Sequence, residues 1–182
     1  MLKRIPYDGN VTYIVYTREL GLIFAVATGV RKSESKLRYA LQEYSICTLS
    51  VVKGKHVWRI TSAISNYNVY LHSGEYKAKK VIVHVCSVIL RLIQGQEKDE
   101  RLYDVCVSGL EHIVSSESLK IESIEIILLL KILSLLGYVN ADTYSEILTS
   151  YVSYNEDQCL YASTHRTELV AVINKGLQES HL

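Results

Sequence analysis

Basic and aromatic side chains alternate through the first third of the chain in a pattern that could bind a polyanion. One group of cations follows Gly29 and another surrounds Gly54. Seven of these cations are candidate phosphate contacts: Arg31, Lys32, Lys36, Arg38, Lys53, Lys55 and Arg59. The interleaved rings are Tyr13, Tyr16, Phe24, Tyr39, Tyr44 and Trp58. Cations can follow the phosphates of a nucleic acid while rings stack on its bases, each stacked base contributing roughly 1–3 kcal/mol. The plainer alternative is that the cations are merely solvated and that several rings, Trp58 among them, fill a core.

Catalytic and cofactor signatures are missing from the sequence. Position 49, where a P-loop ending in Gly54-Lys55 would need glycine, is Leu49, and there is no glycine-rich dinucleotide turn or Gly-x-Ser-x-Gly elbow. His84 and Cys86 lie two residues apart on an expected helix and point about 200° apart, so they cannot share an ion. The sequence therefore predicts no enzyme, no cofactor and no metal site.

Charge is distributed unevenly along the 182 residues, although the net charge is only +1. Residues 1–70 contain ten Lys or Arg and four Asp or Glu, a net charge of +6, whereas residues 71–182 carry −5. A basic segment joined to an acidic one indicates a polyanionic partner for the first.

Residues 1–70 have the composition of short strands. The segments 11–16, 22–28, 45–53 and 56–64 are rich in β-branched and aromatic residues, and Gly21 and Gly54 mark turns between them. Within 11–16, Tyr13 and Tyr16 face opposite sides, so at most one of them faces the core. A short helix is expected near 35–42. The pattern predicts a small antiparallel β-barrel.

Residues 71–182 predict a bundle of helices. Apolar residues recur at three- or four-residue steps over 78–92, 102–113 and 121–135, and further helices are expected over 141–154 and 163–178. The segment 121–135 is apolar nearly all round and should lie at the centre of the bundle. The fold class is therefore α+β, with a barrel domain at 1–70 and an all-helical domain at 71–182.

Compartment and membrane signals point to the cytoplasm. The four cysteines are far apart in sequence, no secretory signal opens the chain, and the most apolar stretch contains Glu125 and Lys131. We expect a cytoplasmic protein with reduced thiols.

Several of these segments also carry a family pattern. The residues Leu2–Asn10 (LKRIPYDGN) followed by Ile14–Gly21 (IVYTRELG), together with Ala27–Ser33 (ATGVRKS) and Ser35–Tyr44 (SKLRYALQEY), resemble the opening of the RecO family of recombination mediators. Trp58–Ala63 (WRITSA) is similar to the last barrel strand of that family. Later matches are Leu90–Gly95, Arg101–Tyr103 and Leu129–Tyr138, so the resemblance covers most of residues 1–140.

This resemblance implies an OB-fold barrel followed by a helical domain, in a bacterial, nucleoid-associated protein. It also implies binding to single-stranded and duplex DNA, annealing of complementary strands, and help in loading recombinase onto DNA covered by single-stranded DNA-binding protein (SSB). The implied partners are a RecR-like protein and the C-terminal tail of SSB.

Two departures from the family pattern matter. Many relatives carry a cysteine zinc module after the segment matching Leu136–Tyr138, but residues 140–156 contain no cysteine, so no zinc is expected. The first strand is a stub of about five residues, which predicts a poorly closed barrel with an exposed edge.

Two other functions remain compatible with the residues. One is a protein-interaction scaffold whose helices bind partners while the barrel has lost its DNA role. The other is an RNA-binding OB-fold protein without annealing activity, since recognition of the 2′-hydroxyl cannot be inferred from sequence.

Overall fold

The structure, a computed structural model, describes residues 3–7, 10–30, 35–55, 57–148 and 150–180, with only the backbone described at Tyr7 and Lys36. The chain divides into two compact units. The sheet unit contains residues 1–72 and also 93–99, and the helical unit contains residues 73–92 and 100–182. The segment 93–99, which links two long helices, therefore belongs with the strands.

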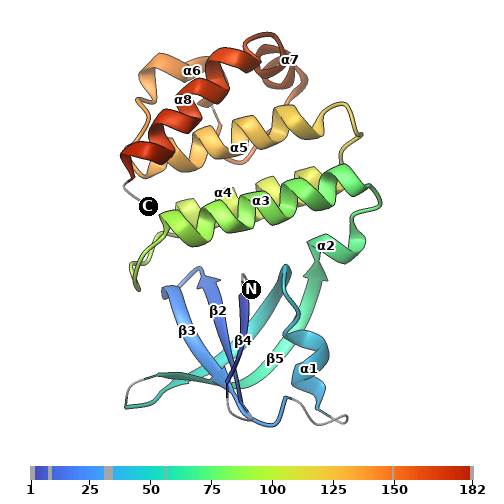
Figure 1. Cartoon of the computed structure of the whole chain (residues 1–182), viewed down its shortest axis with the longest axis vertical. Coiled ribbons are helices and arrows are strands. Elements are labelled where there is room, and N and C mark those ends of the chain that lie inside the picture. Colours follow the sequence, from blue (N-terminus) through green and yellow to red (C-terminus); the bar gives the residue numbers. More distant parts are fainter. Residues whose placement is uncertain (1–2, 8–9, 31–34, 56, 149, 181–182) are drawn as a thin grey trace. The chain divides into compact units, whose positions relative to one another are not determined.

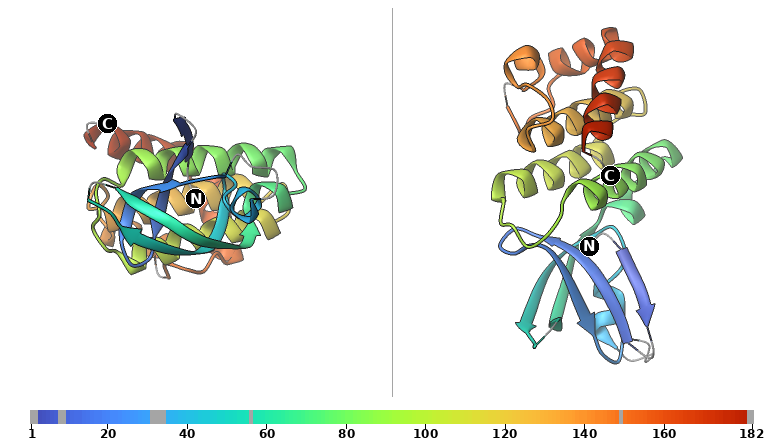
Figure 2. Two further views of the ribbon diagram at one scale, coloured as in Figure 1. Left: turned by 90° about the horizontal axis from the view of Figure 1, so that it is seen from below. Right: turned by 60° about the vertical axis from the view of Figure 1, so that its left-hand side comes forward.

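Five strands form the sheet unit, as the sequence predicts (Figure 1). They are β1 (Lys3–Tyr7), β2 (Asn10–Thr17), β3 (Gly21–Ala27), β4 (Ser45–Lys53) and β5 (Trp58–Asn68). Their spatial order is β1-β2-β3-β5-β4, and helix α1 (Lys36–Ala40) connects β3 to β4. The pairings are antiparallel except that of β3 with β5, which is parallel, so the sheet is mixed. This is the topology of an OB-fold sheet, and Figure 2 shows its strong twist from two further directions.

Alternation along β2 gives each of its two faces a different role. Val11, Tyr13 and Val15 point into the core, where they meet residues of β3 and β5 such as Ile23 and Ile60. Tyr16 lies on the opposite face, as predicted, yet it too is buried, and its hydroxyl donates a 3.5 Å hydrogen bond to the carbonyl oxygen of Asp99. Both faces of this strand are thus covered, which a count of apolar residues alone would not indicate.

The first strand is short, as expected, and the ends of the sheet stay unpaired. No β1–β4 ladder is found among the described strands, so these two strands are the edges. On the open side of β1, the backbone N–H of Arg4 donates to the Glu43 carboxylate at 2.9 Å, and Pro6 has no N–H to offer. Proline on an edge strand and a side chain already bonded to the edge both discourage pairing with another chain.

The helical unit is built around one apolar helix. After α2 (Val69–His72), which ends the sheet unit, come α3 (Tyr76–Leu92), α4 (Glu100–Ser115) and α5 (Ile121–Leu135). Helix α5 is buried along most of its length and packs against α3 and α4 on one side and against the later helices on the other (Figure 1). The prediction that 121–135 lies at the centre of the bundle is confirmed.

The C-terminal helices differ from the sequence prediction. The helix expected over 141–154 is a short 3₁₀ turn (Asp142–Tyr144) followed by α6 (Ser145–Leu148). The helix expected over 163–178 is α8 (Arg166–Glu179), and a further helix, α7 (Glu156–Thr164), precedes it in a segment where none is expected. Asn155 starts α7 because its side chain accepts the N–H of Gln158, whose own side chain accepts the N–H of Asn155. This reciprocal capping stabilises a helix start where the apolar pattern alone predicts a loop.

The cysteines and the helices bear on the compartment prediction. All four cysteines, Cys47, Cys86, Cys106 and Cys159, are free thiols. Among the described helices, none combines the length and apolarity that a membrane crossing requires.

Candidate nucleic-acid interface

The turn between β4 and β5 gathers three of the seven predicted cations. Lys53, Lys55 and Arg59 are all exposed, and the turn itself is closed by a 2.9 Å hydrogen bond from the N–H of Gly54 to the carbonyl oxygen of Val57. A Cβ at position 54 would lie 2.8 Å from that carbonyl oxygen and 3.8 Å from the Arg59 Nε. Glycine is therefore required for a tight turn, and the Arg59 side chain lies against it.

Trp58 supports this hairpin. It pairs in register with Lys53, whose ammonium lies 5.7 Å from the centroid of the indole ring. The indole Nε1–H donates to the Gln96 side chain at 3.3 Å. The ring packs against the sheet core but is only half-buried, so Trp58 both anchors the hairpin and keeps part of its surface in solvent.

Arg59 also belongs to the outer face of the sheet. It stands in register between Val26 of β3 and Val52 of β4. Phe24 is two residues from Val26 on the same face and is 53% exposed. Arg59 and the exposed Phe24 ring therefore share the face away from the core, and a cation with a ring on one face is the combination that single-strand binding uses.

The other four predicted cations are only partly placed. Arg31 and Lys32 lie outside the described residues, as does the side chain of Lys36. Arg38 is exposed on α1 and lines an open groove of about 660 Å³ together with Arg4 and Tyr39. Arg38 therefore does not join the hairpin cluster but lines the same groove as Arg4. In the sequence, Arg4 is one of the ten Lys or Arg residues of the segment 1–70, and nothing in the pattern of cations singles it out. The sequence feature that could have indicated Arg4 is its position on the first strand, which was expected to form an exposed edge.

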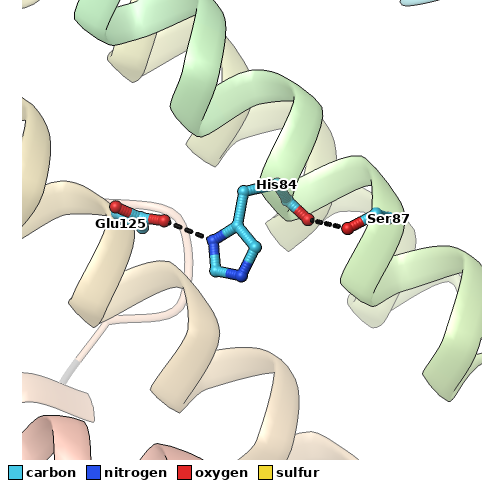
Figure 3. A network of polar contacts seen from close by, with 3 residues as sticks. All are labelled: His84, Ser87 and Glu125. Atoms are coloured by element: carbon cyan, nitrogen blue, oxygen red, sulfur yellow. Dashed lines mark hydrogen bonds and ion pairs between the residues drawn. The ribbon is translucent and has the colours of Figure 1, made fainter.

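One polar set in the helical unit contains the residue types of a hydrolase, but not their geometry (Figure 3). The His84 Nδ1 lies 2.6 Å from a carboxylate oxygen of Glu125, and this hydrogen bond raises the pKa of His84, against the opposing effect of burial. The Ser87 hydroxyl, however, donates to the backbone carbonyl oxygen of His84 at 2.7 Å and not to its ring. The imidazole therefore cannot take the proton of this serine, and the set is a surface ion pair between α3 and α5.

No metal site surrounds His84 among the residues that the structure describes. His84 is exposed and Cys86 is buried, as their spacing on one helix predicts. Across the described chain, no three His, Cys, Asp or Glu side chains lie close enough to hold an ion together.

The fold and the hairpin together define a class of protein, an α+β protein in which an OB-fold sheet with a basic hairpin precedes a helical domain. A family model described as "Recombination protein O C terminal" matches residues 76–171. This match covers more than half of the chain, and the chain belongs to the RecO family. The matched range contains the later motifs Leu90–Gly95, Arg101–Tyr103 and Leu129–Tyr138.

Three curated relatives agree with this assignment, and each is named DNA repair protein RecO. That of Caldanaerobacter subterraneus is 27% identical over 128 residues, which are 69% of this chain and 50% of the relative. That of Gloeobacter violaceus is 26% identical over 121 residues, covering 64% and 45%. That of Chlorobium phaeobacteroides is 27% identical over 181 residues, covering 97% and 66%. The chain spans about half to two-thirds of the length of these relatives.

Proposed function

We propose that this protein acts in DNA repair and recombination by binding single-stranded DNA at the β4–β5 hairpin of its sheet unit. The observation that carries the proposal is the gathering of Lys53, Lys55 and Arg59 around one tight turn, with Trp58 and Phe24 on the adjoining strands. The cations hold the phosphates and the rings offer stacking surfaces. Membership in the RecO family supports DNA as the polymer.

The same proposal extends to the steps of recombination in which the bound DNA takes part. The protein anneals complementary strands without ATP, binds duplex DNA through the same cations, and helps to load recombinase onto SSB-covered DNA with a RecR-like partner and the SSB C-terminal tail. The seven cations from Arg31 to Arg59 are the proposed DNA contacts. The grouping of Lys53, Lys55 and Arg59 around one turn favours this function over a scaffold with evenly spread charge.

Fluorescence-monitored annealing of two complementary oligonucleotides tests the proposal. The wild-type protein should accelerate annealing in the absence of ATP, and the acceleration should fade as salt is raised, because each phosphate contact releases counterions. A variant with Lys53→Gln, Lys55→Gln and Arg59→Gln should bind single strands with a salt exponent smaller by about two, since each contact contributes roughly 0.7.

The matched control removes the same charge from the helical unit through Lys77→Gln, Lys120→Gln and Lys175→Gln. All three lysines are at least partly exposed in surface ion pairs, so their loss should leave the salt exponent unchanged. Equal losses in the two variants would contradict a hairpin site, and no annealing by the folded wild type would favour the scaffold. Competition by RNA of matched sequence distinguishes the RNA-binding alternative.

A further inference from the structure

The open edge of the sheet contains a groove that neither the family assignment nor the hairpin explains. It lies between β1 and the segment running from α1 into β4, where β1 and α1 run close together in the right-hand view of Figure 2. Its volume of about 660 Å³ falls within the range of roughly 300–1,000 Å³ that is usual for small-ligand sites. The lining residues are Arg4, Pro6, Arg38, Tyr39, Leu41, Gln42 and Glu43.

The groove has two uncommitted guanidinium groups. Arg4 and Arg38 are both exposed, and within the described part of the chain neither guanidinium has an ion-pair partner. Glu43 is the one acid in the lining, and its Oε1 already accepts the backbone N–H of Arg4 at 2.9 Å. The lining therefore keeps a net positive charge, in the form of planar forks whose donors match the oxygens of a phosphate.

An aromatic surface accompanies these cations. The Tyr39 side chain, on α1, is 67% exposed. Leu41, two residues further along the chain, is almost completely buried and supplies an apolar wall of the groove. An exposed ring has no favourable packing contact in water, whereas stacking a flat base on it lowers the free energy of binding. Two guanidinium groups and one ring in a groove match the two ends of a nucleotide, whereas a bare anion would leave the ring unused.

We propose that this groove binds one unstacked nucleotide, with its phosphate held by Arg4 and Arg38 and its base stacked on Tyr39. The site depends on the fold, since Arg4 and Arg38 are distant in sequence and meet only because the barrel is not closed between β1 and β4. The inference rests on the proposed function for the source of the nucleotide, which is a DNA strand. A free nucleotide has the same chemistry and is the other source.

Photocrosslinking tests the contact directly on the full-length chain. A short single strand with one iodouracil base should crosslink to Tyr39 on irradiation, as mapped by mass spectrometry. Tyr39→Phe should retain single-strand affinity, whereas Tyr39→Ala and Arg4→Gln should each lower it roughly tenfold. Lys3→Gln, a neighbouring charge on the same strand outside the groove lining, is the matched control and should change affinity little.

The outcomes separate this inference from the proposed function. A strand that binds and crosslinks at Trp58 or Phe24, but never at Tyr39, would overturn the groove site and leave the hairpin interface standing. If no strand binds, thymidine monophosphate is titrated while the backbone amide signals of Arg4 and Tyr39 are followed by NMR. Saturable shifts that disappear in Arg4→Gln would support a free-nucleotide site, and unchanged signals would overturn the inference.

Discussion

At the scale of single residues, Tyr13 is a core residue with a polar defect. Its side chain is completely buried, and its hydroxyl has no hydrogen-bond partner among the residues that the structure describes. Burial raises its pKa, and the nearby Arg4 offsets part of that rise. Because an unpaired buried hydroxyl costs roughly 1–3 kcal/mol, Tyr13→Phe should raise the free energy of unfolding by about 1 kcal/mol.

Chemical denaturation followed by Trp58 fluorescence measures this change in the sheet unit. Tyr16→Phe is the matched control, because its hydroxyl donates to Asp99 and its loss should destabilise the same unit slightly. A Tyr13→Phe protein less stable than wild type would show that the hydroxyl is satisfied in solution.

Lys131 presents the opposite case, a buried charge with few partners. Its side chain is inaccessible to solvent, its ammonium donates to the carbonyl oxygen of Ser153 at 2.6 Å, and it lies 3.9 Å from the centroid of the Tyr154 ring. Burial lowers the pKa of Lys131 to about 8. Below that pH the folded state must hold a buried charge, and this penalty is relieved as pH rises toward the unfolded value of about 10.5.

The expected result is a pH-dependent difference between wild type and Lys131→Met. The free energy of unfolding of the wild type should increase relative to the variant by up to about 3 kcal/mol between pH 7 and pH 10. Urea titrations at both pH values measure it, and comparing two proteins cancels the other titrating groups. A difference that does not change with pH would show that the folded-state amine has an ordinary pKa.

At the scale of elements, the contact between α4 and α5 depends on one glycine. A Cβ at Gly109 would lie 2.5 and 2.6 Å from the two terminal carbons of Leu128 and 2.7 Å from the Tyr154 hydroxyl. Overpacking of this kind typically costs 1–3 kcal/mol. We expect Gly109→Ala to lower the free energy of unfolding by about 2 kcal/mol, even though alanine favours helices more than glycine does.

Circular dichroism of the helical signal during denaturation measures this effect. Gly74→Ala serves as the control, because a Cβ there would meet no atom within 4 Å. Equal stability of the Gly109→Ala protein and wild type would mean that α4 and α5 can separate at no cost.

At the scale of the whole molecule, the chain passes from one unit to the other more than once. The segment 93–99 belongs to the sheet unit, where Gly95 accepts the backbone N–H of Leu22 at 3.1 Å. Gly21 has a φ of +65°, and a Cβ there would lie 2.3 Å from the carbonyl oxygen of Glu97. Gly21→Ala should therefore destabilise the sheet unit by about 2 kcal/mol through both backbone strain and a clash.

Gly29→Ala separates these two effects. Gly29 has a φ of +68°, but a Cβ there meets no atom within 4 Å, so this variant has the strain without the clash. The midpoint of the Trp58 fluorescence transition should fall further in Gly21→Ala than in Gly29→Ala. Equal midpoints would mean that the segment 93–99 does not hold the turn.

Local patterns in the sequence predict most of the elements. The β-branched segments form strands, the apolar stripes form α3, α4 and α5, and Lys53, Lys55 and Arg59 surround the turn that Gly54 marks. These features depend on residues within a few positions of each other, so periodicity and turn chemistry are sufficient to find them. The apolar pattern does not predict helix α7, because the start of this helix depends on side-chain capping by Asn155, which leaves no apolar pattern.

The sequence by itself determined the fold class, the central helix, the cations of the hairpin and the family motifs, because each is written in neighbouring residues. Only the tertiary structure decided that Tyr16 is buried along with Tyr13, that 93–99 belongs with the strands, and that Arg4 meets Arg38 at the open edge of the sheet. These outcomes depend on contacts between residues tens of positions apart. Strand pairing and loop packing set such contacts, and the local spacing of residue types does not encode them.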